Sequence, residues 1–175
     1  MTARTLFAVA AFAALSGWVS GSAPAVGRTA DEEATLLAKN RRLLEGLLGD
    51  GLKLADAETP LDRADACRRA ADRLAVEMTA AARYEDGDRV NEIGGQLTDL
   101  LTDGFLPPFT TARAEIGPES PEFDRLQLLR RESAAQLAAA VDGLPTTGSF
   151  AARPRVTALR RKLAALAAQV PPPGE

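Results

Sequence analysis

The sequence has 175 residues and a formal net charge of −3, with 46% hydrophobic and 26% charged residues. This length suits one domain with a core of its own, and the composition is that of an ordinary globular protein rather than a disordered one. The mildly acidic charge argues against a nucleic-acid binder, which would normally be basic. The sequence contains no histidine, so the usual general base and the commonest metal ligand are both missing.

The first 25 residues have the features of a secretory signal peptide. Arg4 supplies a positive charge, Leu6 to Leu15 form an apolar run, and residues 23–25 (APA) match a cleavage site. The apolar run is shorter than the roughly 20 residues that span a bilayer. We therefore expect residues 1–25 to be a cleaved signal peptide, with an uncleaved anchor as the alternative. The mature protein would begin at Val26 and be exported, either periplasmic or secreted.

The following residues predict an all-α fold, a small helical bundle of four to five helices, with residues 29–144 forming the bundle. Thr29, with Glu32 three residues later, forms a capping box for the first helix. Paired leucines then recur at helical spacing from residue 36 to residue 48. Such pairs give a wide apolar face, suited to packing against several helices. Glycines at positions 46, 49 and 51 predict a kink or an early stop near 49–51.

A second helix is predicted from Thr59-Pro60, as N-cap and first helical residue, to about Arg83. Its apolar stripe includes Cys67, the one cysteine of the sequence, so no intramolecular disulfide can form. We expect this thiol to pack in the core, and a bridge between two chains is the alternative. The outer surface of the helix carries charges spaced for pairing one turn apart, at Asp65, Arg69, Arg73 and Glu77.

The acidic segment 84–88 lacks the spacing of a calcium loop, and we interpret it as a turn in which Asp86 or Asp88 caps the next helix. That helix should end at Gly104 and precede a loop of about fifteen residues, bracketed by two proline-containing pairs. Ser120-Pro121 predicts the start of a further helix. Residues 145–153 are expected to be a linker. The expected inner faces are Val90, Ile93, Leu97, Leu100 and Leu101 in the first of these helices, and Phe123, Leu126, Leu129, Leu137 and Val141 in the second.

Residues 154–170 predict a basic amphipathic helix, followed by a tail, residues 171–175, that we expect to be disordered. Its apolar seam steps by three and four residues. The favoured interpretation is that it docks on the bundle with its charges in water; contact with an acidic partner and contact with an anionic membrane are the alternatives. Membrane contact is the least favoured, because no Trp or Phe lies on the seam. The candidate partner-binding residues are Arg153, Arg155, Arg160, Arg161 and Lys162.

The stretch 59–101 (TPLDRADACRRAADRLAVEMTAAARYEDGDRVNEIGGQLTDLL) resembles the helical hairpin of an uncharacterised domain found in exported bacterial proteins, some of them associated with extracytoplasmic sigma-factor systems. An Ala-rich helix with an A-x-R-L-x-E core, here Ala71 to Glu77 with one extra residue, leads through a polar turn into a second helix. The resemblance covers about a quarter of the chain. It implies an α-hairpin with no known activity and transfers no site residues.

Catalysis has little support in the sequence. Without histidine, Ser-His, Cys-His and HExxH arrangements cannot form. A carboxylate pair is the remaining generic option, but most acidic residues fall at predicted caps or on polar helix faces. These are Glu32, Glu33, Asp62, Asp65, Asp72, Glu92, Asp99 and Asp103. We therefore expect no catalytic residues, no metal site and no cofactor.

Three function classes follow. The favoured one is a non-enzymatic interaction or scaffold protein of the cell envelope, whose partner is another envelope protein. The second is a chaperone-like or stress-responsive periplasmic binder of apolar segments, which requires an exposed apolar surface. The third is an enzyme of unfamiliar type, which requires converging buried carboxylates. The sequence leaves the oligomeric state open.

Overall fold

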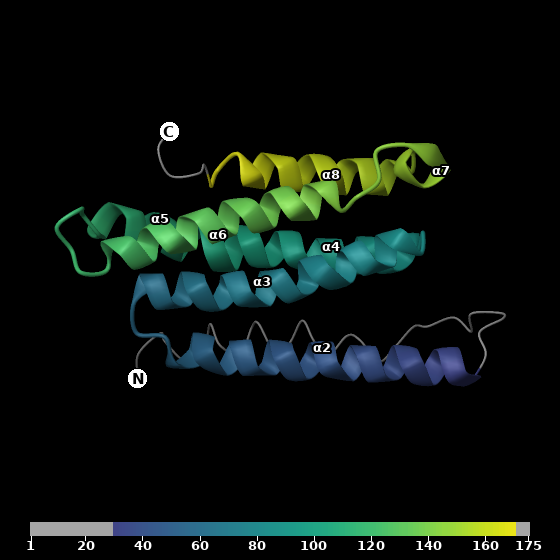
Figure 1. Cartoon of the computed structure of the whole chain (residues 1–175), viewed down its shortest axis with the longest axis horizontal. Coiled ribbons are helices and arrows are strands. Elements are labelled where there is room, and N and C mark those ends of the chain that lie inside the picture. Colours follow the sequence, from purple (N-terminus) through teal and green to yellow (C-terminus); the bar gives the residue numbers. More distant parts are fainter. Residues whose placement is uncertain (1–29, 171–175) are drawn as a thin grey trace. The chain divides into compact units, whose positions relative to one another are not determined.

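The computed structural model describes residues 30–170, which are helical with no strand among them (Figure 1). The predicted all-α fold is therefore confirmed. The chain divides into two compact units, residues 1–42 and 43–175, and each is considered by itself. None of the described helices is long and apolar enough to cross a bilayer. The expected signal peptide, the capping residue Thr29 and the tail after residue 170 lie outside the described residues.

The described helices outnumber the four to five predicted. In chain order they are α2 (Ala30–Asp56), α3 (Pro60–Arg83), α4 (Gly87–Asp99), the π-helix η2 (Leu100–Phe105), α5 (Leu106–Glu115), α6 (Phe123–Asp142), α7 (Gly148–Ala151) and α8 (Pro154–Ala167).

Helix α2 runs without a break to Asp56, so the predicted kink or stop near residues 49–51 is wrong. A glycine inside a helix costs only about 1 kcal/mol relative to alanine. Contacts with the rest of the second unit offset this cost, because Leu47 and Leu54 pack against its hydrophobic core. The glycines are therefore tolerated in a helix that tertiary contacts hold in place.

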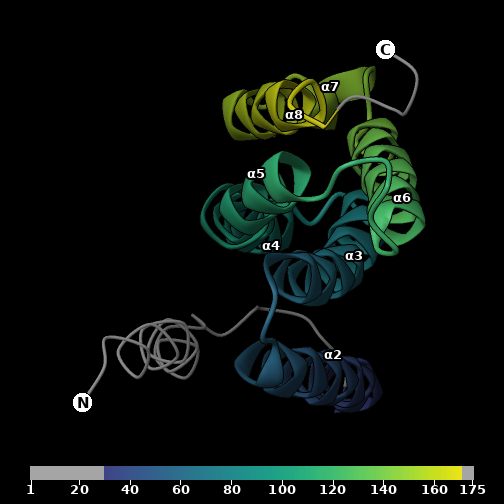
Figure 2. The same ribbon diagram turned by 90° about the vertical axis from the view of Figure 1, so that its left-hand side faces the viewer.

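Helix α3 is the centre of the second unit and contacts α4, η2, α5 and α6 (Figure 2). It begins at Pro60 with Thr59 as N-cap and ends at Arg83, as predicted. Its predicted stripe is buried, Cys67 included. Burial raises the pKa of the Cys67 thiol to about 11, so this cysteine serves as a core residue and not as a reactive thiolate.

The predicted loop after Gly104 is wrong: α4, η2 and α5 follow one another directly as helix. The proline pair lies at the start of α5, where a missing N–H donor costs little. Just before it, the Leu106 N–H bonds to the Leu101 carbonyl, one residue further back than in an α-helix. The buried rings of Phe105 and Phe109 stack 5.0 Å apart and anchor this segment in the core. Gly104 packs against α3, since a Cβ there would lie 3.2 Å from the Cys67 sulfur.

Helix α6 begins at Phe123, and not at Ser120-Pro121, because Ser120 lies in the preceding turn and its hydroxyl accepts a hydrogen bond from the Glu122 N–H at 3.3 Å. The predicted inner face of α6 is fully buried only in its middle, at Leu126, Leu129 and Leu137. Phe123 and Val141, at its two ends, are half-buried. The predicted linker 145–153 contains α7, whose Phe150 is buried.

Candidate interaction surface

The basic residues of the final helix lie around a helix that is packed on the rest of the second unit. Helix α8 contacts α4 and α6 (Figure 1), and its whole predicted seam is buried, at Val156, Leu159, Leu163, Leu166 and Val170. Gly94 of α4 makes room for α8, because a Cβ there would collide with the Leu159 side chain. The apolar side of α8 is therefore used inside the chain.

The candidate partner-binding residues have different surroundings. The guanidinium of Arg153 lies over the Phe150 ring, 4.8 Å from its centroid. The Lys162 ammonium lies 3.1 Å from the Thr98 hydroxyl and 3.7 Å from the Asp99 carboxylate. Arg155 and Arg161 are exposed, and Arg160 is half-buried. These charges surround a docked helix whose large apolar side chains are all buried.

An exposed apolar surface occurs instead on α2. Within the second unit, Leu44, Leu48 and Leu52 follow one another at intervals of four residues and are 36%, 47% and 69% exposed. Residues four apart share one face of a helix, so the three side chains form one row, which we call the leucine row. Leu37, in the first unit, is itself 68% exposed.

The leucine row arises from the paired leucines of the sequence. In the two pairs of the second unit the first member faces inward, since Leu43 is buried and Leu47 is half-buried against the core, while the following leucine is exposed. Sequence reasoning expected the paired leucines to pack against several helices, and within the second unit only one side of them does so. One neighbouring helix can cover only one of two adjacent leucines, so the pairing itself was the sequence feature that could have predicted this exposed surface.

A buried carboxylate orients α2. Asp50 lies on the inner side, with its side chain 1% exposed, and accepts a hydrogen bond from Arg73 Nε of α3 at 2.7 Å. Arg69 Nε lies 3.7 Å and Lys53 Nζ 3.8 Å from its other oxygen. Gly46 leaves space for the Arg73 guanidinium, which would be 2.8 Å from a Cβ at that position. Removing one member of such a pair is costly, so α2 cannot rotate easily to bury the leucine row.

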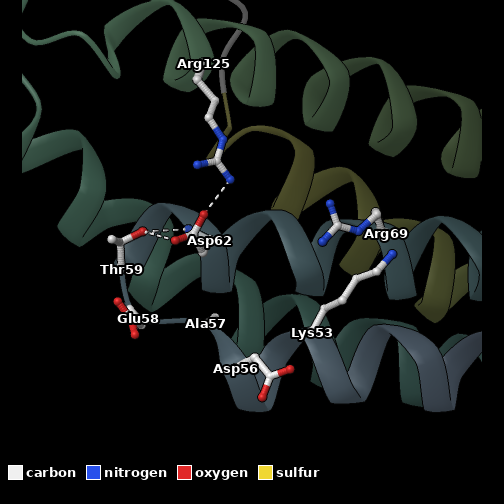
Figure 3. Close-up of a pocket in the computed structure, with 8 residues that line it drawn as sticks. All are labelled: Lys53, Asp56, Ala57, Glu58, Thr59, Asp62, Arg69 and Arg125. Atoms are coloured by element: carbon white, nitrogen blue, oxygen red, sulfur yellow. Dashed lines mark hydrogen bonds and ion pairs between the residues drawn. The ribbon is translucent and has the colours of Figure 1, made fainter.

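A shallow depression of about 400 Å³ lies where α2 joins α3, and Figure 3 shows the residues that line it. Its cations already face carboxylates of the chain: Arg125 binds Asp62 at 2.6 Å, and Arg69 binds Asp65. The hydroxyl of Thr59 donates to Asp62 at 2.7 Å. This hydrogen bond, followed by that from Arg125, lowers the pKa of the Asp62 carboxyl. Internal ion pairs therefore hold both of these arginines.

Most acidic side chains singled out in the sequence are in ion pairs, in caps or on exposed helix faces, as for Asp62, Asp65 and Asp72. Among the described residues, no group of three or more cysteine, aspartate or glutamate side chains is placed to hold a metal ion.

Comparisons with known proteins give no family and no fold relative. No protein-family model, no curated protein and no solved structure matches this chain. The resemblance of residues 59–101 to a hairpin of exported bacterial proteins therefore stays a prediction.

Proposed function

We propose that this chain is a non-enzymatic helical interaction protein that binds another polypeptide through the leucine row of α2. The observation that supports this function is the contrast in burial: the seam of α8 is buried within the chain, while Leu48 and Leu52 are 47% and 69% exposed. Exposing one apolar row costs solubility, whereas covering it with a partner helix contributes about 25 cal/mol for each Å² of apolar surface removed from water.

The partner that fits is an amphipathic helix. The leucine row is one residue wide, which matches the apolar stripe of one helix better than a broad protein surface. The ion pairs of Asp50 hold the opposite side of α2 on α3, so the row is presented on a fixed scaffold. A pre-organised surface binds more tightly because less conformational entropy is lost on association.

We also propose that the protein is exported and acts in the cell envelope. The support is the order of positive charge, apolar run and cleavage pattern in residues 1–25. N-terminal sequencing of material recovered from outside the cytoplasm should find Val26 as the first residue. Recovery of the chain in the cytoplasm with residues 1–25 intact would contradict export without touching the role of the leucine row.

The interaction is tested by placing a photo-crosslinking amino acid at position 48 and identifying the proteins it captures. A captured protein should bind the purified wild-type chain, and Leu48→Glu should abolish that binding. Leu128 on α6 supplies a matched control, since it is also 47% exposed but lies elsewhere, and Leu128→Glu should leave binding unchanged. Equal losses from the two variants would contradict a specific role for the leucine row.

A chaperone-like role, the alternative from the sequence, predicts a different result in the same experiment. A binder of unfolded apolar segments would capture many unrelated chains at position 48, and the purified protein would suppress the aggregation of a denatured client protein. Capture of one partner, without such suppression, favours a specific interaction protein.

A further inference from the structure

We propose that the polypeptide that covers the leucine row is a second copy of this chain, with the two α2 helices packed antiparallel. The inference rests on the proposed function and names its partner. It is carried by two features of α2 that the fold of one chain leaves unexplained, namely the exposed leucines and the helix-interior Gly51.

The first feature is a heptad seam of large and small residues. Leu44, Leu48, Gly51 and Ala55 follow one another at steps of four, three and four residues, the spacing at which residues of one helix meet a single partner helix. Both leucines and Ala55 are exposed, and Gly51 is half-buried. The seam is thus large at its beginning, small at its end, and uncovered along its length within the second unit.

The second feature is Gly51, which no contact within the described part of the second unit explains. In the described part of the chain, and apart from the two neighbouring residues and the nearby backbone of α2 itself, no atom lies within 4 Å of a Cβ built at Gly49 or at Gly51. By contrast, Gly46, Gly94 and Gly104 each leave room for a specific neighbouring side chain. A helix-interior glycine costs about 1 kcal/mol, and no contact in the second unit requires Gly51. A small residue in a helix seam lets a second helix approach closely.

Because large residues come first and small residues last, the seam fits against a second copy of itself that runs in the opposite direction. In an antiparallel pair, Leu48 of one chain lies opposite Gly51 of the other, and Leu44 lies opposite Ala55. Each large side chain then fills the space above a small one, the alternation that gives close packing between facing helices. In a parallel pair, leucine would meet leucine and glycine would meet glycine, which leaves a void at one end. The size order therefore favours the antiparallel arrangement. A partner helix of unrelated sequence would have no reason to match this order of sizes, whereas a second copy of α2 carries the matching order in its own sequence.

The mass of the full-length protein in solution tests the proposal. One chain has a mass of 18.4 kDa, and light scattering over a dilution series should show twice that mass at high concentration. Gly51→Leu should raise the dimer dissociation constant about tenfold or more, because the added side chain forces the helices apart. Gly49→Leu is the matched control: residue 49 is equally uncrowded but lies off the seam, so the dimer should persist.

Engineered disulfides test the orientation. A disulfide should form when chains carrying Leu44→Cys are mixed with chains carrying Ala55→Cys, because the antiparallel arrangement places these two positions opposite each other. The native Cys67 is buried and does not interfere.

Two outcomes would overturn the second-copy inference. One is a protein that stays monomeric at all concentrations, and the other is a dimer that Gly51→Leu and Leu48→Glu leave intact. A monomer whose position 48 still captures a different protein would overturn this inference while supporting the proposed function. A monomer that captures nothing at position 48 would contradict both.

Discussion

Helix α8 and the part of α2 in the second unit, residues 43–56, carry the most regular leucine patterns in the chain, and they use them differently. Helix α8 has one apolar residue per turn on a narrow seam, and the structure buries the whole seam against α4 and α6. Helix α2 has leucines in pairs and buries one member of each pair while the other is exposed. The single seam of α8 is covered by neighbouring helices of the same chain, whereas the double seam of α2 leaves one row exposed.

The largest expected effect is the difference in stability loss between a substitution in the buried seam of α8 and one in the leucine row. Leu163→Ala in α8 should lower the free energy of unfolding by about 2–5 kcal/mol, since the side chain is fully buried and its removal leaves a cavity. Leu48→Ala should change it by no more than about 0.5 kcal/mol, the range of surface substitutions. Urea unfolding of dilute protein, in which contact between chains does not contribute, measures both. Similar losses from the two variants would break the comparison.

The second prediction concerns the inner side of α2. Asp50→Ala should cost about 1–3 kcal/mol, because it leaves Arg73 and Arg69 without their buried carboxylate. The cost is below that of a fully buried pair, since the Arg73 side chain is 48% exposed and water partly replaces its partner. Asp72→Ala, at an exposed position of α3, is the control and should be nearly neutral. An unchanged midpoint in Asp50→Ala would mean that the ion pairs do not hold α2.

The third prediction concerns the start of α3. Thr59→Ala should cost about 1 kcal/mol at neutral pH, because Thr59 accepts a hydrogen bond from the Asp62 N–H and donates one to the Asp62 carboxylate. The folded-state pKa of Asp62 is below its ordinary value of 3.8. The resulting stabilisation is therefore present above that value and lost as the pH falls through the lower folded pKa.

Measurement of the melting temperature from neutral pH to acid pH checks this sign. Asp62→Asn should lose less stability than wild type over the acid range, since its side chain no longer gains a proton. A steeper acid loss in the variant than in wild type would contradict the assignment.

The smallest expected effect is that of the basic residues of α8. Reversing Arg160, Arg161 and Lys162 to Glu should change the free energy of unfolding by less than about 1 kcal/mol, because exposed ion pairs contribute little and the Lys162–Asp99 pair has side chains 55% and 73% exposed. Circular dichroism melts at low and high salt measure it. A large loss would show that α8 is held by charge and not by its seam, and a loss of partner capture with unchanged melting would give the basic residues a binding role.

Local patterns in the sequence were sufficient to predict several elements. The N-cap and proline at Thr59-Pro60 predicted α3, the acidic turn predicted Asp86 as the cap of α4, and the buried stripes of α3 and α8 followed from apolar spacing. These features depend on residues within one or two turns of each other, and a local hydrogen bond or a single periodic face decides them. The absence of histidine excludes several catalytic arrangements in any fold, because those arrangements require that residue type itself.

Features that depend on distant residues required the tertiary structure. The proline pair at 107–108 predicted a loop, but the buried rings of Phe105 and Phe109 keep that segment helical through a π-helical turn. The glycines of α2 predicted a break, but the core contacts of Leu47 and Leu54 preserve the helix. Which leucine is exposed in the α2 pairs of the second unit also depends on other helices: the inner side of α2 carries Asp50, which binds Arg73 of α3. Sequence periodicity defines the faces of a helix, and only the neighbouring helices decide which face is covered.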